Sequence, residues 1–154
     1  MSVETVKTHL AKYMAGQRIR FMPELTATVE LAAAAIGVEP ARIAKTLAIR
    51  LKGGGDAVIL VMKGTARLDN AKFKARFGTK PIFIRKEECQ ALTGHPPGGV
   101  CPFGLPPDLP VYLDQSLREF DRLFPAAGSV DNFVDASPEE LERWTGGEWV
   151  DVCV

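Results

Sequence analysis

Hydrophobic residues recur every three or four positions in several stretches of the chain, which is the spacing of one buried helix face. The clearest stretch is 3–14, where Val6 and Leu10 stand one turn apart and Gly16 follows the end. Flanking residues mark other boundaries, because Ser, Thr and Asp cap helix starts and Gly favours helix ends. The predicted helices are 3–14, 29–36 between Thr28 and Gly37, 70–77 between Asp69 and Gly78, 86–92, and one that starts at Pro138 after the cap Ser137.

An uninterrupted apolar run, 57–62, has the length of a strand and predicts a central strand buried on both faces. The segment 46–51 before it also has strand character. Between them Gly53-Gly54-Gly55-Asp56 predicts a turn, so the two strands should form a hairpin. Further short strands are predicted at 18–22, closed by Pro23, and at 81–84, 111–114, 120–124, 132–134 and 149–152.

Helices and strands are mixed without strict alternation, which indicates the α+β class. We expect a mixed, partly closed and barrel-like sheet surrounded by helices. A chain of 154 residues has the size of one ordinary domain, and 46% hydrophobic residues are enough for one core. The whole chain, 1–154, is therefore expected to form a single domain.

The composition disfavours a disulfide framework and a metal site. The cysteines, Cys89, Cys101 and Cys153, follow no zinc or redox spacing, and His9 and His95 are the only histidines. We expect no metal and no other cofactor. The N-terminal residues lack a signal-peptide core, and no apolar run approaches the ~20 residues that cross a bilayer. These features predict a soluble, cytoplasmic protein with no membrane partner.

The charges are distributed unevenly although the net charge is zero. Residues 1–86 hold 16 of the 19 Lys and Arg residues but only 6 of the 19 Asp and Glu residues. Such asymmetry is a hint of a surface that faces a polyanion. The alternative is that the two halves interleave in the fold and neutralise each other.

The segment 93–110 contains four glycines and six prolines and is long for a loop inside one domain. Loops of that length are often functional. Gly98 and Gly99 can turn consecutive backbone N–H groups toward one point, as an oxyanion or a bound anion requires. The alternative is a rigid surface loop that covers a sheet edge.

Two side chains of this loop, His95 and Cys101, could form a nucleophile and base pair. No cysteine-protease signature surrounds them. Cys101 beside Pro102 also fits a small buried residue, and His95 fits a group that hydrogen bonds its own loop. Both interpretations stay open on the sequence.

Lys45 stands just before the predicted strand 46–51, between apolar neighbours. Lysine is a compact charge that suits a phosphate. The alternative is a lysine that extends from a strand end into solvent. Phe21, Met22 and Phe103 could line an apolar pocket or belong to the core.

These residues stand in an order that resembles the YbaK/EbsC family, which includes the editing domain of bacterial prolyl-tRNA synthetases and its free-standing relatives. The most specific part is the segment 93–104, a glycine-rich loop that ends in Pro-Phe-Gly and contains the Gly-x-x-x-Pro element from Gly98 to Pro102. The resemblance extends over about 3–152. The other segments that carry it are 28–33, 37–38, 43–47, 111–117, 120–121, 128–129 and 140–141.

The resemblance implies the editing-domain fold and hydrolysis of the ester between a wrong amino acid and the 3′ end of tRNA, with tRNA(Pro) as the expected class. It implies that Lys45 grips a phosphate, that Gly98 and Gly99 hold the carbonyl, and that water or a substrate group attacks. The expected substrate-binding residues are Thr46, Phe21, His95, Cys101, Pro102 and Ser129.

The implied partners are the 3′ end of an aminoacyl-tRNA and an aminoacyl-tRNA synthetase, with no DNA, for a monomer or weak homodimer. Relatives that clear alanine have a histidine near 128–132, which this chain lacks. The alanine-specific subgroup is therefore disfavoured. Two alternatives remain, a non-catalytic module that binds a nucleotide or the tRNA 3′ end, and a thiol hydrolase that uses Cys101.

Overall fold

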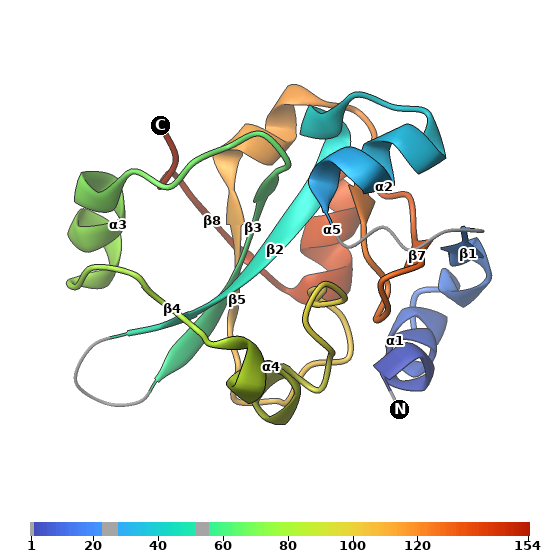
Figure 1. The fold of residues 1–154 in the computed structure, drawn as a ribbon, viewed down its shortest axis with the longest axis horizontal. Coiled ribbons are helices and arrows are strands. Elements are labelled where there is room, and N and C mark those ends of the chain that lie inside the picture. Colours follow the sequence, from blue (N-terminus) through green and yellow to red (C-terminus); the bar gives the residue numbers. More distant parts are fainter. Residues whose placement is uncertain (1, 23–27, 52–55) are drawn as a thin grey trace.

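The centre of the fold is an antiparallel hairpin of two long strands, β2 (Ile43–Arg50) and β3 (Ala57–Lys63). The computed structural model describes residues 2–22, 28–51 and 56–154, so the predicted Gly53–Gly55 turn and Pro23 lie outside the described residues. Six residues of β3 are buried, which confirms the central strand that its apolar run predicts. The ribbon in Figure 1 shows this hairpin running through the middle of the molecule.

The other strands extend this hairpin into a mixed sheet with the order β4-β2-β3-β5-β8. β5 (Val111–Asp114) lies parallel to β3, and β8 (Glu148–Val150) lies parallel to β5. The outer edge of β2 is shared by β4 (Ile82–Phe83) at one end and β6 (Phe124–Pro125) at the other. The sheet is open, so the expected partial closure into a barrel is wrong. A small separate sheet pairs β1 (Arg20–Phe21) with β7 (Asn132–Phe133).

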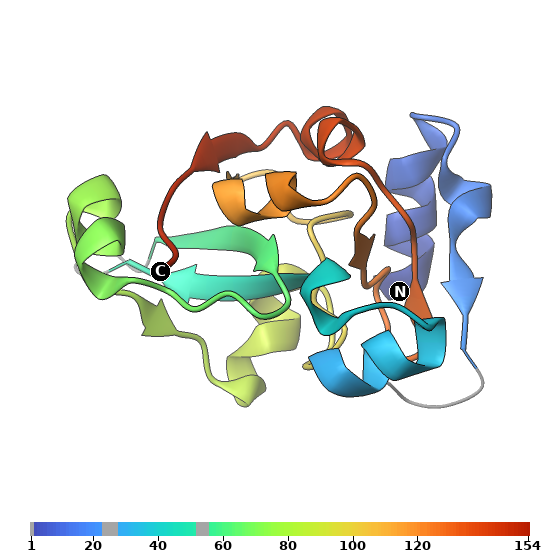
Figure 2. The ribbon, with the colours of Figure 1, turned by 90° about the horizontal axis from the view of Figure 1, so that it is seen from above.

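Helices cover both faces of the sheet, as Figure 2 shows in a view from above. Alternate residues of β3 point to opposite faces. Ile59 and Val61 pack with α1 (Ser2–Ala11) and α5 (Pro138–Thr145), whereas Leu60 and Met62 pack with α3 (Asn70–Phe77). The remaining helices are α2 (Val29–Ile36) and α4 (Lys86–Thr93), with short 3₁₀ helices at η1 (Gly16–Arg18), η2 (Pro40–Arg42) and η3 (Gln115–Glu119).

The predicted helix caps form as hydrogen bonds. The Thr28 hydroxyl accepts from Leu31 N–H, and the Asp69 carboxylate accepts from two N–H groups of the first turn of α3. Gly37 and Gly78 adopt the left-handed conformation that ends a helix. These local signals explain why helix boundaries follow from the sequence within one to three residues.

Two strand predictions miss a boundary by three or more residues, whereas the others differ from the observed strands by two residues or fewer at each end. The predicted strand 120–124 contributes only Phe124 to a strand, because η3 ends at Glu119 and the residues between form no ladder apart from a single bridge of Leu123 with Ala136. The strand predicted to begin at Thr46 begins at Ile43, so Lys45 lies inside β2. Tertiary pairing with β3 and β6 extends this strand.

Most charges of the basic half of the sequence that form ion pairs do so with the acidic half. Basic groups of 1–86 pair with acidic groups of 87–154 in most of the ion pairs of the described residues, so a single basic face does not follow from the asymmetry. Among these pairs are Arg42–Asp121, Lys63–Glu119, Arg76–Glu148 and Lys72–Asp151. Within the described chain, no helix is both long and apolar enough to cross a membrane.

The most enclosed of these ion pairs joins Arg18 to Glu140 at 2.7 Å. Hydrogen bonding from Arg18 lowers the pKa of Glu140 to about 2, and burial opposes this shift. Glu140 also completes a capping box with Ser137, and the Arg18 guanidinium lies over the Trp144 ring. This contact therefore attaches the segment after α1 to the start of α5.

We predict that Glu140→Gln lowers the free energy of unfolding at pH 7 by about 2 kcal/mol, because a charge-assisted hydrogen bond is lost. A carboxyl whose folded pKa is depressed stabilises above its ordinary value of 4.5 and loses this contribution as the pH falls toward 2. The variant should therefore differ most from the parent above pH 4.5 and converge with it near pH 2. Urea unfolding across this range measures it, with exposed Glu139→Gln as the control; an equal effect of both variants would contradict the assignment.

Candidate active site

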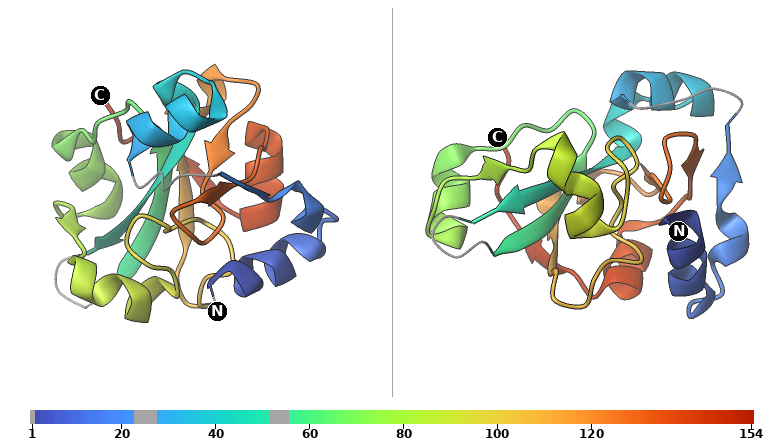
Figure 3. Two further views of the ribbon diagram at one scale, coloured as in Figure 1. Left: turned by 45° about the vertical axis from the view of Figure 1, so that its right-hand side comes forward. Right: turned by 60° about the horizontal axis from the view of Figure 1, so that its bottom comes forward.

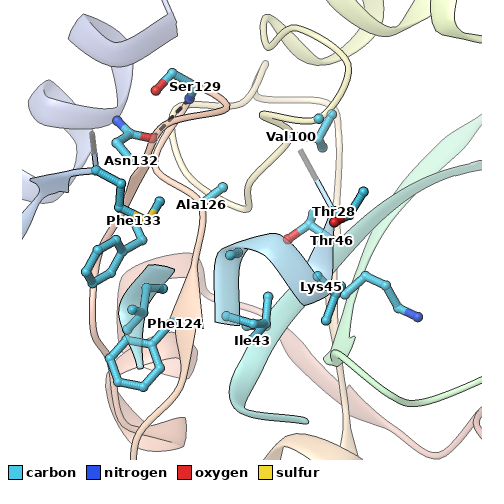
Figure 4. Close-up of a pocket in the computed structure, with 16 residues that line it drawn as sticks. Thr28, Ile43, Lys45, Thr46, Val100, Phe124, Ala126, Ser129, Asn132 and Phe133 are labelled. Atoms are coloured by element: carbon cyan, nitrogen blue, oxygen red, sulfur yellow. Dashed lines mark hydrogen bonds between the residues drawn. The ribbon is translucent and has the colours of Figure 1, made fainter. Parts of the chain in front are cut away.

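A cavity of about 180 Å³ lies beside the outer edge of β2 and is bounded by Met22 and four longer segments of the chain, 28–36, 43–46, 98–100 and 124–133. Figure 4 shows side chains from these segments around the cavity, with the Lys45 side chain directed away from the others. Its size is below the ~300–1,000 Å³ of sites for drug-sized ligands. The lining residues are Met22, Thr28, Val29, Ala32, Ile36, Ile43, Ala44, Lys45, Thr46, Gly98, Val100, Phe124, Ala126, Ser129, Asn132 and Phe133.

One wall is the glycine-rich loop, and its shape decides which backbone groups face the cavity. Gly98 has a φ of +83°, and Gly99 N–H donates to Pro96 C=O at 2.9 Å. That bond occupies the Gly99 donor. Of the predicted pair, Gly98 lines the cavity and Gly99 does not. Among the described residues, no acceptor lies against Gly98 N–H or Val100 N–H. Both residues line the cavity, so their N–H groups are candidate donors to a ligand there.

A second wall, adjacent to this loop, is the segment 126–133, whose backbone is held by the Asn132 side chain. The Asn132 side chain is 2% exposed and bonds both Ala127 N–H and Ala127 C=O, and it also accepts from Ser129 N–H. Gly99 packs directly on this segment, since a Cβ at Gly99 would lie 3.0 Å from the Ser129 backbone. Figure 3 shows the two loops side by side. Gly99 thus lets the backbone of the loop approach the Ser129 backbone closely.

The start of β2 supplies Lys45 and Thr46, which point to opposite faces of the strand because they are neighbours. Thr46 lies on the face of Ala44, and its buried hydroxyl has no hydrogen-bond partner within the described chain. Lys45 points away from Ser129 in Figure 4, and its ammonium donates to Ala66 C=O at 2.9 Å. Burial lowers the pKa of Lys45, and nearby Arg67 adds to this effect.

His95 and Cys101 lie in the core instead of the cavity. Both are 0% exposed. His95 Nε2 is 2.7 Å from the Phe103 carbonyl, which can only accept, so this nitrogen carries the proton and cannot take one from Cys101 Sγ at 3.6 Å. Burial raises the pKa of Cys101 to about 12. The geometry therefore opposes a cysteine nucleophile with His95 as its base.

Of the remaining residues predicted to bind the substrate, some line the cavity and some do not. Thr46 and Ser129 line the cavity. Pro102 is buried within the loop and Phe21 is 57% exposed, and neither lines the cavity, whereas Met22 does. Sequence reasoning missed the wall made by α2 and by Ala126, Asn132 and Phe133. The alanine run of α2, which permits close approach, was the available signal for part of it.

Helix α1 holds both loops through two sets of contacts. Ser2 Oγ lies 2.5 Å from both His95 Nδ1 and Gly128 C=O, two acceptors that share its single hydroxyl proton. His9 accepts from Gly104 N–H at 3.0 Å. Gly104 and Gly128 both have positive φ and sit so close to α1 that a Cβ would lie 2.9 Å from its atoms. One helix thus fixes the separation of the two cavity walls.

No group of three or more His, Cys, Asp or Glu side chains that could hold a metal ion occurs within 2–22, 28–51 and 56–154. The cavity lining contains none of these residue types, and its polar side chains are Lys45, Asn132 and three hydroxyls. The chemistry available to it is hydrogen bonding from backbone N–H, hydroxyl and amide groups, with one ammonium nearby.

The chain is similar to known proteins over nearly its whole length. A family model described as "Aminoacyl-tRNA editing domain" matches residues 23–144. "Uncharacterized protein YwhH" of Bacillus subtilis (strain 168) is 43% identical over 155 residues, covering 99% of this chain and 98% of that protein. "Putative Cys-tRNA(Pro)/Cys-tRNA(Cys) deacylase EbsC" of Enterococcus faecalis (strain ATCC 700802 / V583) is 26% identical over 126 residues, covering 81% and 76%. A crystal structure of "a putative trans-editing enzyme for prolyl tRNA synthetase" has a TM-score of 0.88 and 31% identity, covering 99% and 97%.

We predict that Ser2→Ala destabilises the protein by about 1–3 kcal/mol, because it leaves His95 Nδ1 and Gly128 C=O without their shared partner. Thermal unfolding measures the loss. Thr8→Ala on the exposed face of α1 is the matched control, since that hydroxyl bonds only Glu4 C=O of its own helix. Equal melting temperatures for Ser2→Ala and the parent would show that the contact does not hold the loops.

Proposed function

Since this chain belongs to the aminoacyl-tRNA editing domain family, we propose that it is a trans-acting deacylase that hydrolyses the ester of a mischarged tRNA, with tRNA(Pro) as the class. The match confirms the resemblance to YbaK/EbsC proteins and the α+β editing-domain fold. The observation that carries the proposal is the small cavity in which Gly98, Thr46 and Ser129 converge, next to Lys45.

Lys45 is suited to a phosphate of the terminal nucleotide. Its ammonium is half-buried and held by one carbonyl, and Arg67 is exposed nearby. A phosphate would bring a full negative charge to a cation that now contacts only a dipole, and such charge-assisted bonds are about twice as strong as neutral ones. Lys45 and the glycine-rich loop lie on opposite sides of β2, so a nucleotide on one side and an aminoacyl group on the other must meet at its edge.

Ester hydrolysis in this cavity would depend on position and on backbone donors. In the proposed reaction, the N–H groups of Gly98 and Val100 stabilise the oxyanion while water or a substrate hydroxyl attacks the ester carbonyl. One such donor contributes about 3–4 kcal/mol to lowering the barrier in well-studied hydrolases. An activated ester needs less assistance than an amide, and a small enclosed cavity supplies orientation as well.

The tRNA(Pro) class is supported by the names of EbsC and of the trans-editing enzyme to which the chain is similar. The cavity volume favours a small side chain, and the absence of histidine at 128–132 disfavours alanine. The proposed ligand is the 3′ end of an aminoacyl-tRNA in the cytoplasm, with an aminoacyl-tRNA synthetase as candidate partner.

We predict that Lys45→Ala lowers kcat/KM for release of amino acid from mischarged tRNA(Pro) by roughly 100-fold, the loss expected for one charge-assisted phosphate contact. Unfolding should change little, because the ammonium makes one carbonyl contact. The control is Lys74→Ala, an exposed lysine of α3. Parent-like turnover by Lys45→Ala would contradict the phosphate role. A protein that retards tRNA without releasing amino acid would instead be the non-catalytic binding module.

We predict that Cys101→Ala retains deacylation within about threefold of the parent, because this thiol is buried and faces His95 Nε2–H and Phe103 C=O. The measurement is the initial rate on the substrate that the parent hydrolyses best. Control melting curves separate lost chemistry from lost fold, since a buried Cys→Ala change removes packing volume. Complete loss of activity in a variant that folds would instead support the hypothesis that the protein is a thiol hydrolase.

A further inference from the structure

The outer edge of β2 carries a gap between its two strand partners. β6 pairs with Ile43 and Ala44, and β4 pairs with Ile49 and Arg50. No strand of the described chain covers the residues between them, 45–48, on that edge. Backbone groups that point outward in this gap are therefore open to a ligand.

The register shows which groups these are. Ala48 C=O accepts from Ile84 N–H, so the N–H and C=O of Ala48 point away from β3. Pairing of β2 with β3 is regular from Ala44 to Arg50, and backbone direction alternates along a strand. Thr46, two residues earlier, therefore directs both its N–H and its C=O to the open edge. Neither group has a hydrogen-bond partner among residues 2–22, 28–51 and 56–154.

This gap opens on the cavity. Thr46 and Ala44 are part of its lining, opposite Gly98 and Ser129. The Thr46 hydroxyl, which is buried and unpartnered in the described structure, lies in the same wall. Three polar groups of one residue are thus left unsatisfied at one place, whereas most buried polar groups in proteins have partners.

An extended residue with its N–H and C=O pointing the same way pairs with another residue in the same conformation, and the two exchange N–H···O=C bonds. An α-aminoacyl ester offers this arrangement in one small unit, with an α-ammonium as donor and an ester carbonyl as acceptor. Its α-ammonium would donate to Thr46 C=O, and its carbonyl would accept from Thr46 N–H.

We propose that the Thr46 backbone binds the α-amino group and the carbonyl of the aminoacyl ester as one added strand residue, and thereby selects esters that carry an α-amino group. The inference rests on the proposed deacylase function. It makes the α-amino group a determinant of specificity that is separate from the side chain of the amino acid. The Thr46 N–H then acts on the same carbonyl as the donors of the glycine-rich loop.

The test compares three esters of one tRNA that have the same side chain and carry an α-amino group, an α-hydroxyl group or no group at the α-carbon. Each enzymatic rate is divided by the buffer hydrolysis rate of the same ester, which removes differences in intrinsic reactivity. We expect the acceleration to fall roughly 10- to 100-fold from the amino ester to the ester without a donor, with the hydroxy ester between them, because one charge-assisted hydrogen bond is lost.

The Thr46→Val variant separates the backbone from the side chain, because it removes the hydroxyl and keeps the N–H and C=O. It should retain the preference for the amino ester over the ester without a donor. Equal acceleration of all three esters by the parent, or loss of the preference in Thr46→Val, would overturn the inference while the deacylase function stands. No acceleration of any ester would instead refute the deacylase function itself.

Discussion

The site depends on the contact between α1 and two loops that are distant in sequence. Ser2 stands between His95 and Gly128, and His9 stands between Gly104 and the C=O of Trp144. These bonds are buried or partly buried, and the glycines let the backbones approach within the space that a side chain would fill. These contacts of α1 thereby hold the two walls of the cavity at one separation.

The other wall depends on an incomplete sheet edge. β4 and β6 each take two residues of β2, and the strand between them keeps its backbone groups for a ligand. In the proposed function, Lys45 on one face and Thr46 on the other bind two chemically different parts of the substrate. An extended strand loses no conformational entropy when a ligand binds, because pairing with β3 already fixes its backbone.

Local signals made much of the fold predictable. Thr28, Asp69 and Ser137 cap the helices that they predict, and the apolar run of β3 is buried. The sequence also points to Lys45 and the glycine-rich loop, which lie at the cavity, but it does not give the orientation of their groups. The face of the sheet to which Lys45 points depends on how β2 pairs, and the Gly99 N–H is bonded to Pro96 C=O. Residue types alone do not determine this pairing or this turn geometry. The burial of His95 was also not predictable from local sequence, because its partner Ser2 is 93 positions away.

That sequence separation has a consequence for how the molecule forms. Ser2 must meet Gly128, 126 residues later, before the cavity has both walls. Contacts of such long range are slow to close and come late, whereas helices and the β2–β3 hairpin need only near neighbours. A nascent chain can therefore build its central hairpin early, yet the pocket is assembled only after the ribosome has released Gly128, so incomplete chains are without it.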